Sequence, residues 1–267
     1  RKHAEQAQAP TVLPYRFGPR LENSATVPRK ELLRFLTEAS LLNQLIVVRG
    51  PPGSGKTTLL AQWLELSRKV DRPVAWLTLD AADAHAATMV AGMADALEHA
   101  GCKATAERFR AVTLEVGLFA ISQAARDLAA AGNAANERPI IILDRFERID
   151  GSPIDELVSC LLHHSTSLTL VIASRTRPAI PLGALRARNQ YVEIGPSDLN
   201  LTPLEARAVF DADVPEMYTR RLHLETSGEA VAVGFARRVL DTPGGGLDTG
   251  SWREQLGEYY RTEVLDS

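Results

Sequence analysis

One stretch of this chain, residues 45–60, limits what the chain can fold into more than any other. It begins with a short apolar run at 45–49, continues as a loop rich in glycine and proline, and ends where leucines begin to recur at helical spacing. The apolar run is typical of a buried strand, and the recurring leucines are typical of a helix with one apolar face. The sequence therefore predicts a strand, a loop and a helix in immediate succession.

The loop has a complete phosphate-binding pattern, G-x-x-x-x-G-K-[ST], followed by a second threonine. Its residues are Gly50, Pro51, Pro52, Gly53, Ser54, Gly55, Lys56, Thr57 and Thr58. Glycines let successive N–H groups point inward, prolines stiffen the loop, and the following helix adds the positive end of its dipole. We predict that Lys56 reaches the β- and γ-phosphates of ATP or ADP and that Thr57 binds Mg²⁺. A glycine-rich turn that binds nothing is the alternative, but the complete pattern and its flanks favour a nucleotide site.

Composition defines the class of protein in which this loop lies. The 267 residues are 45% hydrophobic and 24% charged, which is typical of a globular protein with one large domain or one domain and a smaller module. The net charge of −3 argues against nucleic-acid binding as the main function. Without a long apolar run or a signal peptide, and with only Cys102 and Cys160, we expect a cytoplasmic protein with reduced thiols and no membrane contact. Because the first residue is Arg1 rather than Met, we expect a piece of a longer protein.

Predicted strands and helices alternate up to about residue 194. Apolar runs at 73–79, 140–143 and 168–173 predict further strands, and 191–194 predicts an edge strand. The run at 140–143 is too apolar for a half-exposed strand, so it belongs inside a parallel sheet. The alternation predicts an α/β fold of the P-loop NTPase kind, with a mostly parallel doubly wound sheet and right-handed crossovers.

The pattern changes to helices alone after Gly195 and Pro196. Thr202 and Pro203 read as an N-cap and a first helical residue, and two more helices fit before a Pro-Gly-Gly-Gly segment at 243–246. We predict an N-terminal arm at 1–24, a nucleotide-binding α/β domain at 25–197, a small helical lid domain at 198–240, a linker at 241–251 and the start of a further helical module at 252–267.

The second half of a nucleotide site requires an acid at the end of a neighbouring strand. Asp144 follows the apolar run at 140–143, and we predict that it holds Mg²⁺ together with Thr57. Rapid hydrolysis also needs a residue that orients or deprotonates the attacking water. Arg145 stands where such an acid would serve, and strand alternation predicts that it points away from the site. Glu147 is the nearby substitute for a catalytic acid, so we expect slow turnover at most.

Two other positions follow the ends of predicted strands. Arg175 comes at the end of the strand at 168–173, the sheet edge at which open α/β folds bind ligands, and it could sense a terminal phosphate. A surface arginine or an ion pair is the alternative. Asp80 and Asp83 could line the same site, or they could cap a helix and form a solvated turn.

Several stretches, taken in order, resemble a known family. They are residues 27–29, 50–64, 74–80, 140–144, 170–175, 185–188 and 201–205. The set resembles the nucleotide-binding module of STAND proteins, which are signal-transduction ATPases with numerous domains. It is most similar to the large LuxR-type transcriptional activators typified by the maltose-regulon activator of enteric bacteria.

This resemblance implies a switch between ATP and ADP states. ADP would be held between the α/β domain and the lid in a closed monomer, whereas ATP with an inducer would favour an open, self-associating form. Val27 and Arg29 match the segment on the adenine side, and Arg175 matches the sensor position. The family usually has a second Asp at the position of Arg145. Its replacement by arginine should affect ATP hydrolysis, but not the binding of nucleotide or Mg²⁺.

The resemblance also implies functions for domains outside this chain. A small-molecule or protein inducer would bind those domains, and the family's helix-turn-helix lies outside this sequence, so we expect no DNA binding by this chain. A P-loop ATPase whose turnover drives motor or remodelling work is the alternative function, and a small-molecule kinase is a weaker one. A switch should retain its nucleotide and turn over slowly, whereas a motor should reach ~1 s⁻¹ or more.

Overall fold

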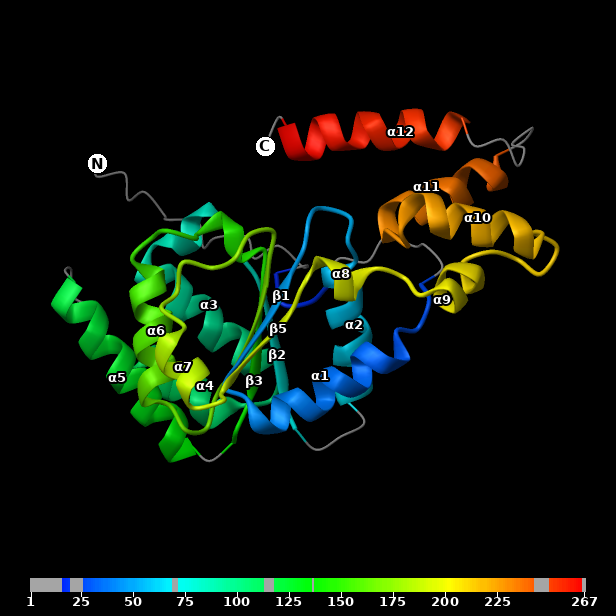
Figure 1. The fold of residues 1–267 in the computed structure, drawn as a ribbon. Helices are drawn as coiled ribbons and strands as arrows, with labels where there is room; N and C mark the ends of the chain where they lie inside the picture. Colours follow the sequence, from blue (N-terminus) through cyan, green and yellow to red (C-terminus); the bar gives the residue numbers. More distant parts are fainter. Residues whose placement is uncertain are drawn as a thin grey trace, which may run out of the picture.

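A five-stranded parallel sheet lies at the centre of the first part of the chain (Figure 1). Its strands are β1 (Leu45–Arg49), β2 (Val74–Thr78), β3 (Ile140–Asp144), β4 (Thr169–Ser174) and β5 (Tyr191–Ile194). They are ordered β2-β3-β4-β1-β5, and every neighbouring pair is parallel. The predicted α/β fold is confirmed, with β3 inside the sheet and β5 at one edge. The computed structural model describes residues 16–19, 26–68, 72–112, 118–135, 137–242 and 250–265.

Helices cover both faces of this sheet, as Figure 1 shows, with α1 and α2 on one side and α3 to α7 on the other. The helices are α1 (Lys30–Leu42), α2 (Lys56–Ser67), α3 (Ala86–His99), α4 (Lys103–Arg110), α5 (Leu118–Ala135), α6 (Ile154–His164) and α7 (Gly183–Ala187). Short 3₁₀ turns occupy Ala81–Ala84 and Phe146–Arg148. Parallel strands joined by crossover helices require this two-sided cover, because every strand then buries both of its faces.

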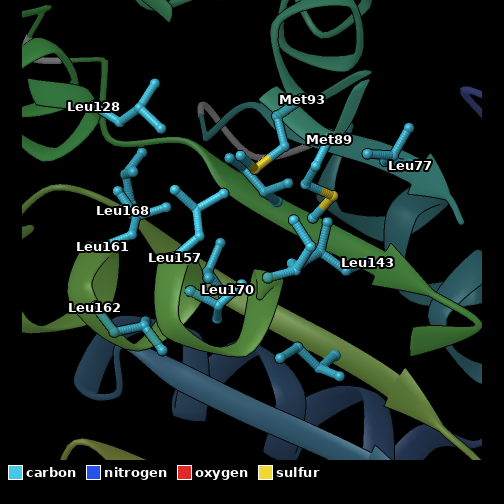
Figure 2. Close-up of a cluster of buried hydrophobic side chains, with 14 of the residues drawn as sticks. Leu77, Met89, Met93, Leu128, Leu143, Leu157, Leu161, Leu162, Leu168 and Leu170 are labelled. Atoms are coloured by element: carbon cyan, nitrogen blue, oxygen red, sulfur yellow. The ribbon is translucent and has the colours of Figure 1, made fainter. Parts of the chain in front are cut away.

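Alternate side chains of each interior strand enter different hydrophobic clusters. In β3, Ile141 and Leu143 pack with α3 and α6 (Figure 2), whereas Ile140 and Ile142 pack with α1 and α2. This alternation follows from the two-residue period of a strand. It also sets the direction of Asp144, the last residue of β3, which should face α2 as Ile140 and Ile142 do.

The second part of the chain is helical and has a hydrophobic cluster of its own. The short helix α8 (Pro196–Leu199) leads into it, and its Leu199 still packs in the cluster with α1 and α2. The helices of the second part are α9 (Pro203–Ala208), α10 (Glu216–Thr226), α11 (Ala230–Asp241) and α12 (Gly250–Tyr260), which continues as a π-helical turn at Arg261–Leu265. As the sequence predicts, Thr202 caps α9: its hydroxyl accepts the N–H of Glu205, whose carboxylate accepts the N–H of Thr202.

The predicted domain boundaries stay predictions, and parts of them lie outside the described residues. Most of the predicted arm (1–15 and 20–24) and of the linker (243–249) falls there. In the described part, Trp252 of α12 is buried in the same cluster as Phe210 and Val233, so α12 packs on the lid helices. Among the helices that the structure describes, none has both the length and the apolar character needed to cross a membrane.

Candidate nucleotide-binding site

The phosphate loop, residues 50–58, lies between β1 and α2 at the carboxyl edge of the sheet. The main-chain N–H of Gly50 donates to the main-chain oxygen of Ser174 at the end of β4, and this bond fixes the start of the loop to the neighbouring strand. Gly53 and Gly55 have φ angles of +75° and +87°, in the left-handed region that glycine adopts readily. Helix α2 begins at Lys56, immediately after Gly55. The predicted strand, loop and helix therefore follow one another without interruption.

Lys56 is held at the mouth of this loop. Its Nζ donates to the main-chain oxygens of Gly50 at 2.6 Å and Pro51 at 2.9 Å, and it lies 3.4 Å from the Ser54 hydroxyl. Burial lowers the pKa of the Lys56 ammonium to about 8, although the nearby charges of Glu147 and Asp144 oppose that shift. An ammonium group in this position can meet phosphate oxygens directly.

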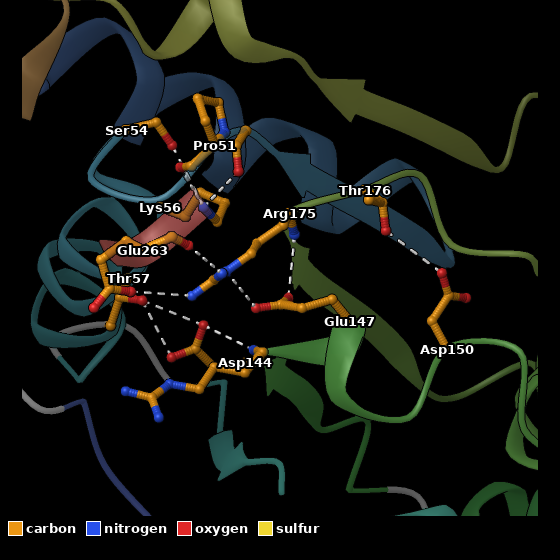
Figure 3. Close-up of polar contacts among 12 residues, drawn as sticks. Pro51, Ser54, Lys56, Thr57, Asp144, Glu147, Asp150, Arg175, Thr176 and Glu263 are labelled. Carbon is orange, nitrogen blue, oxygen red and sulfur yellow. Dashed lines mark hydrogen bonds and ion pairs between the residues drawn. The ribbon is translucent and has the colours of Figure 1, made fainter. Parts of the chain in front are cut away.

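Asp144 and Thr57 meet where β3 ends and α2 begins (Figure 3). The Thr57 hydroxyl donates to the Asp144 carboxylate, with Oγ1 lying 3.2 Å from Oδ2 and 3.3 Å from Oδ1. Asp144 is only 4% exposed, and burial raises the pKa of its carboxyl group. The hydrogen bond from Thr57 lowers that pKa and so opposes the shift. A hydroxyl and a carboxylate are hard oxygen donors of the kind that Mg²⁺ prefers, so these two residues fit the ion that the family uses.

The chain does not continue as a strand after Asp144. Arg145 has a φ of 64°, and a single 3₁₀ turn at Phe146–Arg148 follows. Arg145 is exposed at this turn, where the chain is no longer a strand, and its positive charge acts on the Asp144 carboxyl and lowers its pKa. That its side chain points away from the site stays a prediction. The Arg145 N–H donates to Asp144 Oδ1 at 3.1 Å. Phe146 is fully buried under the turn, and Glu147 comes back toward the end of β4.

Arg175 lies between two carboxylates at the carboxyl end of β4 (Figure 3). Its Nε is 3.3 Å from Oε1 of Glu147, and its main-chain N–H donates to Oε2 of the same residue at 3.1 Å. On the other side, Nη1 donates to the main-chain oxygen of Glu263 at 3.0 Å, and Nη2 is 3.4 Å from its carboxylate. Glu263 lies in the turn after α12, so the end of the helical part reaches this edge of the sheet.

Val27 and Arg29 lie at the opposite end of the site, where Gln62 of α2 holds their main chain. The Gln62 amide donates to the Val27 oxygen at 2.9 Å and accepts the Arg29 N–H at 3.1 Å. The Arg29 guanidinium is buried and donates to the oxygens of Leu199 at 2.8 Å and Asn200 at 2.9 Å. Sequence reasoning missed Gln62, and a glutamine on an otherwise apolar helix face is its only signal.

Arg29 joins the α/β part to the lid. Besides the oxygens at the end of α8, its Nε lies 3.1 Å from the Glu205 carboxylate, which also caps α9. The guanidinium is therefore bound within the connection between the two parts, and Arg29 also lines the cleft. Whether it also contacts adenine stays a prediction.

A cleft of about 900 Å³ separates the phosphate loop from α11. The predicted residues that line it are Val27, Arg29, Gly53, Gly55, Lys56, Thr57 and Thr58, and on the opposite wall lie Ala230, Val231, Gly234, Phe235, Arg237, Arg238 and Tyr259. The walls approach closely, since a Cβ placed on Gly53 would lie 2.6 Å from the Val231 side chain. The cleft is large enough for a nucleotide and is shared by both parts of the chain.

Asp80 and Asp83 do not join this site. The Asp80 carboxylate accepts the N–H of Ala82, and the fully buried Asp83 carboxylate accepts the N–H of Asp80. Arg16 lies 2.6 Å from Asp83 and 3.4 Å from Asp80, and its main-chain oxygen accepts the N–H of Thr78 in β2. The capping alternative therefore holds for both acids, which fasten the segment 16–19 to the edge of the sheet.

The parallel sheet, the complete phosphate loop and the Thr57–Asp144 contact define the chain as a P-loop NTPase. Residues 28–172 match the AAA ATPase domain family, and the chain belongs to that family. The Walker-type ATPase of Pyrococcus abyssi has a similar structure, with a TM-score of 0.54 and 14% identity over 92% of this chain and 77% of that protein. At that identity the similarity concerns the fold alone.

Two longer bacterial proteins are similar to this chain along nearly all of the chain's length. The chain is 31% identical over 266 residues to the HTH-type transcriptional regulator MalT of Cronobacter sakazakii, which covers 93% of the chain and 28% of MalT. It is 28% identical over 266 residues to the serine/threonine-protein kinase PknK of Mycobacterium tuberculosis, which covers 94% of the chain and 23% of the kinase. The resemblance to large LuxR-type activators is thus confirmed, and the chain spans about a quarter of these relatives.

Proposed function

We propose that this chain is the ATP/ADP-binding switch module of a STAND-type, LuxR-family transcriptional regulator. The observation that carries the proposal is the shared cleft, in which the phosphate loop forms one wall and α11 forms the other. A ligand between two walls can change how strongly the walls hold together, and this is the physical requirement for a ligand-driven switch. The similarity to MalT supports the regulatory class.

The nucleotide would lie along this cleft with its phosphates at the loop. Main-chain N–H groups of residues 50–58 and the Lys56 ammonium would bind the phosphates, and Thr57 and Asp144 would hold Mg²⁺. Val27 would line the adenine end, where Gln62 fixes the local main chain. Arg175 would contact the terminal phosphate from the end of β4.

The ADP state would correspond to the closed monomer, and ATP with an inducer would favour an open form that self-associates. The inducer would act through domains outside this chain, and DNA would be bound elsewhere in the whole protein. The close approach of Gly53 to Val231 supports a closed arrangement in which α11 lies against the phosphate loop.

Turnover in this module would be slow at most. Arg145 stands next to the metal-binding Asp144, and a guanidinium stays protonated and cannot serve as a general base. The turnover-driven ATPase remains the second candidate because one acid, Glu147, does lie close to Lys56 and Asp144.

The function is tested by loading with ADP or ATP both the purified chain and the chain together with the proposed inducer-binding domains, and by measuring molecular mass and release of phosphate. The switch predicts retained nucleotide, a monomer with ADP, a higher mass with ATP when the inducer-binding domains are present, and turnover far below ~1 s⁻¹. Fast turnover with a mass that does not depend on the nucleotide would favour the motor ATPase.

A further inference from the structure

Both oxygens of the Glu147 carboxylate contact Arg175. One oxygen accepts the main-chain N–H of Arg175 at 3.1 Å, and the other lies 3.3 Å from Nε of the same residue. The Glu147 side chain is 17% exposed, so water screens this pair only in part. Two contacts from one carboxylate to one arginine restrict the side-chain rotation of that arginine.

The position of Glu147 is fixed by the turn that carries it. The left-handed conformation of Arg145 reverses the chain directly after β3, and Phe146 anchors the turn in the core. The Arg148 N–H donates to the Arg145 oxygen and closes the turn. The carboxylate is therefore a fixed group at the carboxyl edge of the sheet, and not the end of a mobile surface side chain.

We propose that Glu147 is a positioning residue that holds the Arg175 guanidinium so that Nη1 and Nη2 face the terminal phosphate of a nucleoside triphosphate. The proposal rests on the proposed function, because it requires a nucleotide on the phosphate loop. It assigns Glu147 to the recognition of ATP over ADP, and not to proton transfer from water.

The contacts on the far side of the guanidinium support this assignment. With Nε on Glu147, the two outer nitrogens meet two oxygens of Glu263, one from its main chain and one from its carboxylate. A pair of closely spaced, electron-rich oxygens is also what a terminal phosphate offers to an arginine. In Figure 3 the guanidinium extends toward the side on which Lys56 and Thr57 lie.

A general base has a different requirement. It must accept a proton from the attacking water, so it needs an oxygen directed at that water. Each Glu147 oxygen is instead directed at an Arg175 donor. Removal of the carboxylate should therefore weaken the binding of ATP through Arg175.

The test measures the affinities of ADP and of a non-hydrolysable ATP analogue by calorimetry. The variants are Glu147→Gln, Arg175→Gln, the double variant and Glu147→Asp, each checked for folding by thermal unfolding. Asp150→Asn is the matched control, since Asp150 accepts the Ala179 N–H at 2.8 Å and thus holds the loop after Arg175 without contacting the guanidinium.

Glu147→Gln should lower the affinity for the ATP analogue about tenfold, the size of one charged hydrogen bond, and change ADP affinity less than about twofold. The double variant should match Arg175→Gln, because Glu147 acts through Arg175. Glu147→Asp should restore part of the loss, and Asp150→Asn should leave the ratio of the two affinities unchanged.

Three results would overturn the proposal. An equal loss of ATP and ADP affinity in Glu147→Gln would assign a structural role. Additive losses in the double variant would separate Glu147 from Arg175. Unchanged affinities, with a turnover rate lowered and no longer rising with pH, would make Glu147 the general base.

Failure of the proposed function would look different. In that case the wild-type chain binds neither nucleotide, or Lys56→Ala binds both as the wild type does. If only the Glu147 proposal fails, the wild type binds both nucleotides, Lys56→Ala binds both far more weakly, and Glu147→Gln keeps the wild-type ratio.

Discussion

At the end of the cleft that we assign to the phosphates, the phosphate end, the Lys56 ammonium meets main-chain oxygens five and six residues away. At the end that we assign to adenine, the adenine end, Arg29 donates to a main-chain oxygen 170 residues away. The first end is built by a short motif that folds on itself. The second end is built by the connection between the α/β part and the lid. The comparison leads us to expect that one end of the cleft supplies ligand affinity, whereas the other end attaches the lid.

The largest expected effect concerns the phosphate end. Lys56→Ala should lower ADP affinity by about a hundredfold, because it removes a cationic donor to phosphate oxygens whose value is roughly 3 kcal/mol. Calorimetry measures this, and Lys30→Ala, an exposed lysine of α1, is the control. Wild-type ADP affinity in a folded Lys56→Ala protein would show that the loop is not the phosphate site.

A substitution at the adenine end should lower the stability of the fold. Arg29→Ala leaves Glu205 and the oxygens of Leu199 and Asn200 without their buried partner, which costs about 3 kcal/mol. For a chain of this size the melting temperature should fall by roughly 6–10 °C. Arg34→Ala removes an exposed arginine from the same helix region and should change it little. Equal melting temperatures for the two variants would remove Arg29 from the connection.

Asp144→Asn should distinguish the contribution of Mg²⁺ to binding from that of the phosphate loop. The amide keeps the shape of the side chain but loses the charge, so ATP binding in Mg²⁺ should weaken about tenfold while ADP binding in a chelator stays near wild type. Titrations with and without Mg²⁺ measure the difference. A similar loss in both conditions would mean that Asp144 supports the fold and not the ion.

The smallest effect is a dependence on pH at Lys56. With a pKa of about 8 for the ammonium, the free protein loses this charge as the pH rises through 8, and phosphate binding favours the charged form. ADP affinity should therefore fall a few-fold between about pH 7 and 9, with proton uptake on binding near pH 8. Calorimetry in two buffers of different ionisation enthalpy counts the protons, and uptake that persists in Lys56→Ala would assign the effect elsewhere.

The phosphate end could be predicted from the sequence because its geometry is local or periodic. The loop pattern identifies Lys56 and Thr57, and the two-residue period of β3 turns Asp144 toward α2. The parallel sheet and its edge strand follow from the same periodicities. The loop was predictable from its motif, and Asp144 and the strands were predictable from their periodicity.

The rest depended on backbone turns and distant partners. The left-handed Arg145 redirects Glu147 toward Arg175, and no spacing in the sequence indicates the sign of a φ angle. The Gln62 amide meets main-chain groups more than 30 residues away, and the Arg29 guanidinium turns to the lid connection. Such side-chain contacts to the main chain carry no pattern that a single sequence shows.

Hydrogen exchange measured with and without ADP tests the central claim, that one nucleotide is held by both walls of the cleft. The account predicts slower exchange on binding at the phosphate loop, residues 50–58, and also at the start of α11, Ala230–Asp241, with both effects lost in Lys56→Ala. Protection confined to the loop, with α11 unchanged, would contradict a nucleotide shared with the lid and with it the proposed switch.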